Sequence, residues 1–329
     1  VLYAANMYFQ SYGAVAIVKI NAHWFHVRER GVFSGIFGAM ISTGLFLAFD
    51  VGNRILHCSL VRGQGYNGGD AVWWVFQTPA ALLAAMFVTE AFLLKDRPGQ
   101  AGYQDFDTGD ASSGESKTKL TVMEIIRHVL THPIILTIAL IEFCTGVLRN
   151  GVMHWFLIYA KEQISGGNTS GFNYISDNWG LLLMIAGITG GMFAGYISDK
   201  FFQSRRAPTA GLLYAALLVA TLMMNPCLGN GWALGLFVFL MSTCVIGTHG
   251  LLSGTATMDF GGTKAAATAV GVIDGFVYLG TGLQSVAIGK ITTSPSLGWS
   301  WWPAFLAPFA LAGFLLLIRI WHAKPTPRH

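Results

Sequence analysis

The chain has 329 residues, of which 53% are hydrophobic and only 11% are charged, and its mean hydropathy is +0.53. This balance excludes a water-soluble domain, because so few polar side chains cannot cover its surface. The formal net charge of +4 does not indicate a nucleic-acid partner, since in a membrane protein the positions of Lys and Arg set the orientation in the bilayer.

Apolar runs of about 20 residues, the length that crosses a bilayer, recur along nearly the whole chain. They predict an all-α polytopic membrane protein, since a signal peptide or a single anchor would give only one such run. We expect nine spans, with the bounds Val1–Lys19, Gly31–Leu56, Ala71–Leu94, Pro133–Ala160, Gly180–Ser198, Pro208–Pro226, Trp232–Gly254, Ala265–Gly289 and Trp301–Trp321.

One polar segment, residues 95–132, interrupts this pattern. Its first part, Lys95–Leu120, is rich in Asp, Ser, Gly and Lys, a composition typical of a linker. Apolar residues then recur at helical spacing and predict a short helix along the cytoplasmic interface, at Val122, Ile125, Ile126, Val129 and Leu130. The segment divides the chain into residues 1–94, with three spans, and residues 133–329, with six.

The positions of the basic residues predict the orientation. If the C-terminus is cytoplasmic, fifteen of the twenty Lys and Arg lie on the cytoplasmic side and Arg149 lies inside a span; the other four, on the outside, are Arg54, Arg62, Lys161 and Lys290. This agrees with the positive-inside rule. Because Val1 lies within an apolar run and no initiator Met precedes it, we expect upstream sequence to be missing.

The sequence gives no sign of a cofactor, a metal site or an enzyme. The four cysteines, Cys58, Cys144, Cys227 and Cys244, have no paired spacing. His23 and His26 lie three residues apart without a third ligand. No glycine loop for a nucleotide and no Ser/His/Asp arrangement is recognisable.

Glycines repeat every four residues at Gly187, Gly191 and Gly195, and again at Gly271 and Gly275. Such repeats predict helices that pack backbone to backbone, and close packing without interlocking side chains allows helices to rock.

The loop between the fifth and sixth predicted spans reads Gly195-Tyr-Ile-Ser-Asp199-Lys200-Phe-Phe-Gln-Ser-Arg205-Arg206. It resembles the cytoplasmic loop signature of the major facilitator superfamily. Asp199 can cap or pair with a neighbouring helix end while the basic residues stay in the cytoplasm. We therefore assign Gly195, Asp199, Lys200, Arg205 and Arg206 to gating; the alternative for the basic residues is a role as positive-inside anchors.

Three further stretches carry a closer resemblance. They are Asn6-Met-Tyr-Phe-Gln10-Ser-Tyr-Gly13 with His23–Gly31, Leu148–Trp155 with Tyr159-Ala-Lys161-Glu162, and Lys264–Gly271 continuing through Tyr278-Leu-Gly280. Over essentially the whole chain they resemble the organophosphate:phosphate antiporters, the family of the glycerol-3-phosphate and hexose-phosphate transporters.

This resemblance implies the major facilitator fold, with two six-helix halves around a central cavity. The chain would then cover the fourth to twelfth helices and lack the first three. Residues 1–94 would end the first half, and residues 133–329 would form the second. The resemblance further implies a monomer in the bacterial inner membrane, surrounded by lipid, with a small anionic substrate and inorganic phosphate as its ligands.

Arg149 is the first candidate for substrate binding. A charged side chain at mid-membrane depth costs roughly 2.5–3.5 kcal/mol on insertion scales. Its planar guanidinium matches phosphate or carboxylate oxygens two at a time, and in the resembled family this arginine grips the phosphate. The alternative is an internal ion pair with Asp274 or Glu142.

We also assign Asn150, His154, Tyr278 and Gln10, which lie within the resembling stretches, to substrate binding. The chain departs from the glycerol-3-phosphate transporter where Met40 replaces a histidine, His154 an acidic residue, and Met184 a buried glutamate. Asp274 and His249 are polar additions within spans, and either can take part in proton coupling, His249 because histidine titrates near neutral pH. We assign Asp274 to coupling; for both residues, the alternative is a packing role.

The expected function is exchange of an organophosphate or similar anion for inorganic phosphate, driven by the phosphate gradient. Two alternatives stay open. One is a proton-coupled symporter of sugar acids or carboxylates, in which Asp274 or His154 carries the proton. The other is a sensor of phosphorylated sugars that binds its ligand without transporting it.

Overall fold

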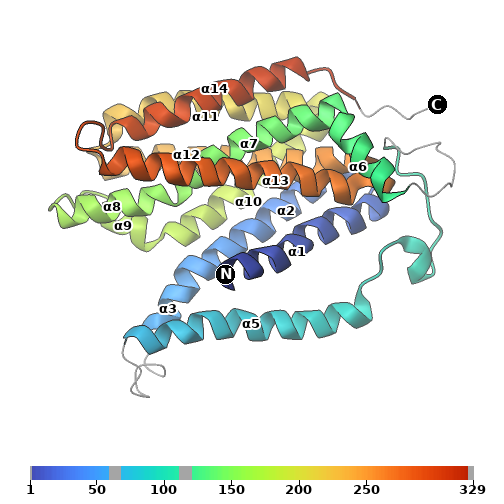
Figure 1. Cartoon of the computed structure of the whole chain (residues 1–329), viewed down its shortest axis with the longest axis horizontal. Helices are drawn as coiled ribbons and strands as arrows, with labels where there is room; N and C mark the ends of the chain where they lie inside the picture. Colours follow the sequence, from blue (N-terminus) through green and yellow to red (C-terminus); the bar gives the residue numbers. More distant parts are fainter. Residues whose placement is uncertain (1, 59–67, 111–120, 325–329) are drawn as a thin grey trace.

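The computed structural model describes residues 2–58, 68–110 and 121–324, which form a bundle of long helices (Figure 1). The start of the first predicted span at Val1, the predicted outside residue Arg62 and residues 111–120 of the predicted linker lie outside this range. The linker's described ends, α6 and the end of α14 lie at one end of the bundle, which we call the linker end (Figure 1).

The helices that precede and form the linker are α1 (Leu2–Trp24), α2 (Arg30–Phe46), the π-helical turn η1 (Leu47–Val51), α3 (Gly52–His57), α5 (Gly68–Leu93), the 3-10 turn η2 (Pro98–Ala101) and α6 (Val122–Thr131). Those that follow are α7 (Pro133–Met153), α8 (Trp155–Ser165), α9 (Phe172–Asp177), α10 (Trp179–Phe202), α11 (Arg206–Cys227), α12 (Gly231–His249), the π-helical η3 (Gly250–Ala256), α13 (Thr257–Thr293) and α14 (Trp301–Arg319).

The polytopic all-α prediction is confirmed. Among the described residues, eight helices are long and apolar enough to cross a membrane, and they correspond to the second through ninth predicted spans. The first predicted span forms the 23-residue helix α1 but is not among those eight. Polar residues such as Asn6, Gln10 and Ser11 lower its hydropathy.

The end of the seventh predicted span is wrong by nine residues. The span continues past Gly254 through η3 and the start of α13 to Thr263. Near the end of this span, Gly262 has a φ of 60° and a ψ of −179°, backbone angles that residues with a Cβ rarely adopt, and the chain turns there. The eighth span begins at Ala265, as predicted. Asp259 therefore lies on a helix and not in a loop.

The short helix predicted at the end of segment 95–132 is present as α6. Thr121 and Glu124 form a reciprocal capping box at its start: the Thr121 hydroxyl accepts from the Glu124 backbone N–H, and the Glu124 carboxylate accepts from the Thr121 N–H. The Thr121 N–H and the Thr121 hydroxyl both donate to the Glu124 carboxylate, which stabilises its ionised form and lowers the pKa of Glu124. The helix packs against α13 and ends where His132 caps α7.

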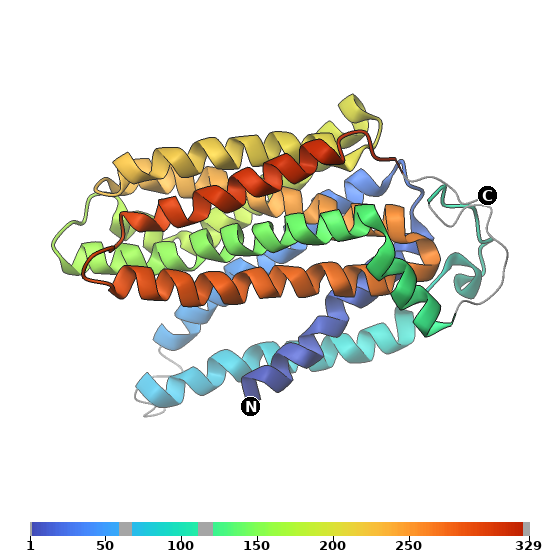
Figure 2. The ribbon, with the colours of Figure 1, turned by 45° about the horizontal axis from the view of Figure 1, so that its top comes forward.

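Two apolar clusters hold the bundle together. The larger one joins α7 to α14 and includes the fully buried Trp179, Tyr214 and Trp302. The smaller one, which we call the gate cluster, joins α1 and α2 to α13 and consists of Val18, Ala22, Phe33, Phe37, Met258, Ala266 and Val270. Figure 2 shows α5 apart from the helices that follow the linker, and it packs against α3.

The first glycine repeat packs as predicted. A Cβ built on Gly195 would lie 2.1 Å from the carbonyl oxygen of Gly31, and one on Gly191 would lie 3.0 Å from that of Ser34, so α10 and α2 are in backbone contact. The second repeat does not: a Cβ on Gly275 meets no atom within 4 Å, and one on Gly271 only just reaches Val15.

Helices α7 and α13 approach as closely at Gly146, which predicts a measurable stability effect. A Cβ there would lie 2.1 Å from the carbonyl oxygen of Val277. Because backbone cannot yield as a side chain does, we expect Gly146→Ala to lower the free energy of unfolding by roughly 1–3 kcal/mol. Thermal unfolding in detergent would measure this. The matched control is Gly282→Ala, where nothing lies within 4 Å; equal melting temperatures of the two variants would contradict the prediction.

Candidate functional site

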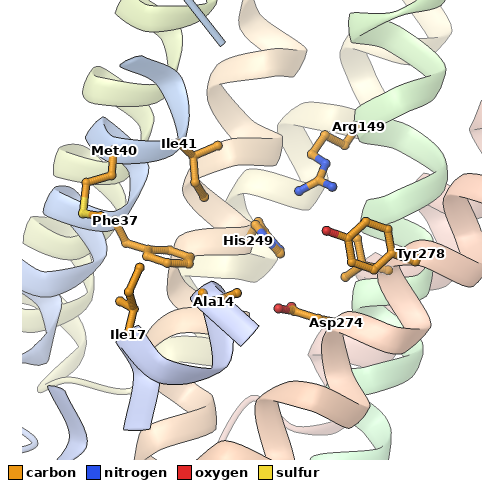
Figure 3. A pocket seen from close by; sticks show the side chains of 11 residues that line it. Ala14, Ile17, Phe37, Met40, Ile41, Arg149, His249, Asp274 and Tyr278 are labelled. Carbon is orange, nitrogen blue, oxygen red and sulfur yellow. The ribbon is translucent and has the colours of Figure 1, made fainter. Parts of the chain in front are cut away.

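A cavity of about 420 Å³ lies between helices from both sides of the linker. Its walls come from α1, α2, α7, α12 and α13, and they are lined by Gly13, Ala14, Ile17, Phe37, Met40, Ile41, Arg149, His249, Asp274, Val277 and Tyr278. Most of these residues are apolar, with a few polar groups pointing inward (Figure 3). This composition is typical of small-molecule sites, in which a few polar groups fix the orientation of the ligand.

Arg149 extends from α7 into this cavity (Figure 3). Its side chain is half-buried, and among the described residues it forms no ion pair and no hydrogen bond. A cation inside a membrane span is costly unless something pairs with it. The wall of the cavity therefore presents an open, permanently charged fork of N–H donors, the geometry that phosphate or carboxylate oxygens require.

The alternative of an internal ion pair for Arg149 is not seen among the described residues, where both candidate partners bond to other groups. Glu142 Oε2 lies 2.7 Å from Nδ1 of His249 on α12. Asp274 Oδ1 accepts a hydrogen bond of 2.5 Å from the hydroxyl of Ser253. Neither contact involves the Arg149 guanidinium, which can therefore bind a ligand.

Two other predicted residues lie close to Arg149 along these helices. Tyr278 lines the cavity, and its hydroxyl points toward the interior (Figure 3). Asn150 is buried and donates to the Thr281 hydroxyl over 2.7 Å. That bond joins α7 to α13 directly beside Arg149, so the contact seen for Asn150 orients the helix and does not reach the cavity.

Gln10 and His154 lie outside the cavity lining. Gln10 is exposed on α1 and donates to the Asn6 side chain over 3.3 Å. His154 stands at the break between α7 and α8, with its ring edge-on to Phe49 at 6.5 Å. The binding roles assigned to both remain predictions. Met40, one of the residues that departs from the resembled transporter, does line the cavity.

A network of buried charges lies toward the linker end, where α2 meets α11 and α13. Arg30 donates to Asp259 over 2.9 Å and to Asp110 of the linker over 2.8 Å. Arg206 donates to the other oxygen of Asp259 over 3.1 Å and to Asp199 over 2.6 Å. Arg30, Asp110, Asp259 and Arg206, all at most 3% exposed, are thus linked in a single chain of ion pairs, which we call the charge network.

The charge network joins the helices on the two sides of the linker. Arg206 also donates to the backbone carbonyl of Val27, in the turn between α1 and α2, over 2.9 Å. A tight turn precedes α11, in which Gln203 and Ser204 both have positive φ. The Ser204 hydroxyl donates to Asp199 within this turn. The loop signature therefore brings Asp199 and Arg206 together.

The other loop-signature residues lie around the charge network without entering it. Arg205 donates to the carbonyl of Phe202 over 3.2 Å. Lys200 is exposed and bonds to the Tyr196 hydroxyl, with its ammonium 4.9 Å from that ring. Gly195 provides the backbone contact with Gly31. Sequence reasoning missed Arg30, Asp110 and Asp259; an acidic residue just before a glycine turn was the available signal for Asp259.

The gate cluster lies directly beside the cavity, because Phe37 belongs to both. The rings of Phe33 and Phe37 are stacked with centroids 5.7 Å apart. Since Val18 and Ala22 on α1 and Met258 on α13 are fully buried against them, apolar side chains close the bundle here. Along α2, the gate cluster therefore lies between the charge network at Arg30 and the cavity lining at Met40 and Ile41.

Comparison with known proteins gives a family and several relatives. The family model described as Major Facilitator Superfamily matches residues 1–285. A glycerol-3-phosphate transporter of Bacillus subtilis (strain 168) is 27% identical, over 98% of this chain and 71% of its own length. A probable hexose phosphate transport protein of Chlamydia pneumoniae is 25% identical, over 97% and 70%. The membrane sensor protein UhpC of Escherichia coli (strain K12) is 24% identical, over 100% and 72%.

Proposed function

Because this chain belongs to the Major Facilitator Superfamily and is a multi-pass membrane protein, we propose that it exchanges an organophosphate or similar organic anion for inorganic phosphate. The observation that carries the proposal is Arg149, whose guanidinium has no ion-pair partner in the described part of the chain and lies on the wall of a cavity of about 420 Å³ inside the membrane spans. The names of the relatives, a glycerol-3-phosphate transporter and a probable hexose phosphate transport protein, support a phosphorylated ligand.

In the proposed mechanism the cavity faces alternate sides of the membrane. The charge network and the gate cluster open and close its linker end, which we place on the cytoplasmic side of a bacterial inner membrane together with the C-terminus. Gly195, Asp199 and Arg206 act in this gate through contacts that cross between the helices of residues 1–94 and those of 133–329. Lys200 and Arg205 surround the gate, and the protein acts as a monomer.

The driving force sets a limit on how tightly the ligands bind. A tenfold gradient of phosphate supplies only about 1.4 kcal/mol. An exchanger must therefore release each ligand readily. We expect a single arginine with Tyr278 beside it to bind the anion with moderate affinity. The same cavity would suit either the organic anion or phosphate, since both offer the same oxygens to the guanidinium.

A proton-coupled symporter is the second candidate, favoured by Asp274 on the cavity wall. Arg149 would bind a carboxylate as well as a phosphate, and Asp274 or His154 would carry the proton. A third candidate, a sensor that binds without transporting, is favoured by the similarity to membrane sensor proteins.

Competition in proteoliposomes separates these functions. With the full-length protein exchanging labelled phosphate, we expect external glycerol 3-phosphate or glucose 6-phosphate to inhibit uptake, while glucuronate at the same concentration does not. Glucuronate uptake that follows a pH gradient and ignores internal phosphate would establish the symporter instead. Phosphate binding without any flux would establish the sensor.

A further inference from the structure

The contact between Glu142 and His249 is unusual for a membrane interior. Glu142 Oε2 lies 2.7 Å from His249 Nδ1, and the two side chains are 0% and 9% exposed. The other carboxyl oxygen of Glu142 is buried and has no hydrogen-bond partner among the described residues. A buried carboxylate with a free oxygen is costly, because nothing replaces the water that the oxygen has lost.

The two residues share one hydrogen bond, so their net charge depends on one additional proton. Without it the pair carries a charge of −1, as a carboxylate beside a neutral imidazole. With it the pair is neutral overall, either as carboxylate and imidazolium or as carboxylic acid and imidazole. Because the two groups share one hydrogen bond, we assign the proton to the pair and not to either residue.

His249 connects this pair to the ligand cavity. Its ring lies on the cavity wall with Arg149 and Asp274 (Figure 3). Glu142, by contrast, is fully buried and is not among the residues that line the cavity. Water in the cavity can therefore deliver a proton to the imidazole, and the hydrogen bond passes the charge to the carboxyl group. The Ser253 hydroxyl already holds Asp274, so the two acidic groups of the cavity region have different partners.

The charged and titratable groups around the pair come from three helices. Helix α7 contributes Arg149 and Cys144, α11 contributes Tyr214, and α13 contributes Asp274 and Tyr278. Of these, Arg149 supplies the only positive charge. When an anion neutralises Arg149, the positive potential at the pair falls and the uncharged form of the pair is favoured.

We propose that Glu142 and His249 form a proton-binding site that takes up a proton when an anion binds at Arg149. The proposal rests on the proposed function for the anion, and it moves the coupled proton away from Asp274 and His154. Because linkage is reciprocal, lowering the pH strengthens anion binding. With one linked proton, the apparent affinity changes at most about tenfold per pH unit.

Calorimetry on the purified full-length protein measures this linkage with inorganic phosphate as the probe. Titration in two buffers of different ionisation enthalpy gives the number of protons taken up per phosphate bound. Ionisation of phosphate itself contributes equally to every variant, so differences between variants come from the protein. We expect Glu142→Gln combined with His249→Gln to take up fewer protons than the wild type, by at most about one, and to bind with a flatter pH dependence.

The Asp274→Asn variant tests whether Asp274, and not the pair, takes up the proton. A proton count that is unchanged in the double variant, or one that falls only in Asp274→Asn, would overturn the proposal. Infrared difference spectra between pH 5 and pH 8 provide a readout without ligand. We expect a carboxyl or imidazole band that changes with pH in the wild type and is lost in the single variants Glu142→Gln and His249→Gln. If phosphate fails to bind, the proposed function fails, while the infrared band still decides the proton site; its presence in the single variants would refute the assignment.

Discussion

Replacing Arg149 with alanine is expected to abolish phosphate exchange. The substitution removes the cation of the cavity that has no protein partner among the described residues. Each hydrogen bond from a charged donor contributes roughly 1.5–3 kcal/mol, so losing a two-pronged contact weakens phosphate binding by about a hundredfold or more. Uptake of labelled phosphate into proteoliposomes, with the amount of inserted protein measured, gives the effect.

Arg149→Lys refines the same prediction. Lysine keeps the charge but loses the planar fork, so we expect partial activity with a raised KM and a smaller change in kcat. Lys290→Ala serves as the control: Lys290 is an exposed cation at the end of α13, and its removal should leave exchange unchanged. Wild-type exchange in Arg149→Ala would show that the anion binds elsewhere.

The second large effect is expected from Asp259→Asn in the charge network. Both carboxylate oxygens of Asp259 accept from buried arginines, Arg30 and Arg206. Removing one member of a buried ion pair costs about 3–5 kcal/mol. Since Arg30 keeps Asp110 and Arg206 keeps Asp199, we expect the lower end of this range. The closed form of the linker end should lose stability relative to the open form by about a hundredfold.

A cysteine in the gate cluster reports this opening. Val18 is 0% exposed and nearly isosteric with cysteine, so Val18→Cys, with the four native cysteines changed to serine, should react slowly with a water-soluble maleimide. We expect Asp259→Asn to accelerate the reaction strongly. The control is Glu90→Gln, an exposed acid on α5. Equal rates in the two backgrounds would mean that the charge network does not hold this end closed.

The sequence predicted most of the fold, because membrane spans are local features. A run of apolar residues, a linker and a capping box depend on neighbours within about twenty positions. The resemblance to the organophosphate:phosphate antiporters was likewise confirmed by the relatives. The end of the seventh span was missed because the residues after Gly254 mix apolar side chains with Thr, Asp and Gly, although the helix continues through them up to the turn at Gly262.

The site was predicted in part, since its members come together from distant positions. Arg149, Tyr278 and Asp274 were recognisable as polar residues inside spans or within the resembling stretches, and the cavity brings them together. Partners were not predictable: Arg30 and Asp259 lie 229 residues apart, and Glu142 and His249 lie 107 apart. Before the helices are packed, no pattern in the sequence indicates which buried acid faces which base.

The measurement that tests the central proposal most directly compares proteoliposomes that contain the full-length protein and are either preloaded with phosphate or empty. An exchanger needs a ligand on the inner side to return the cavity, so preloading should accelerate uptake of labelled external phosphate many times over. Uptake that is equally fast into empty vesicles, or absent from both, would contradict exchange as the function of this protein.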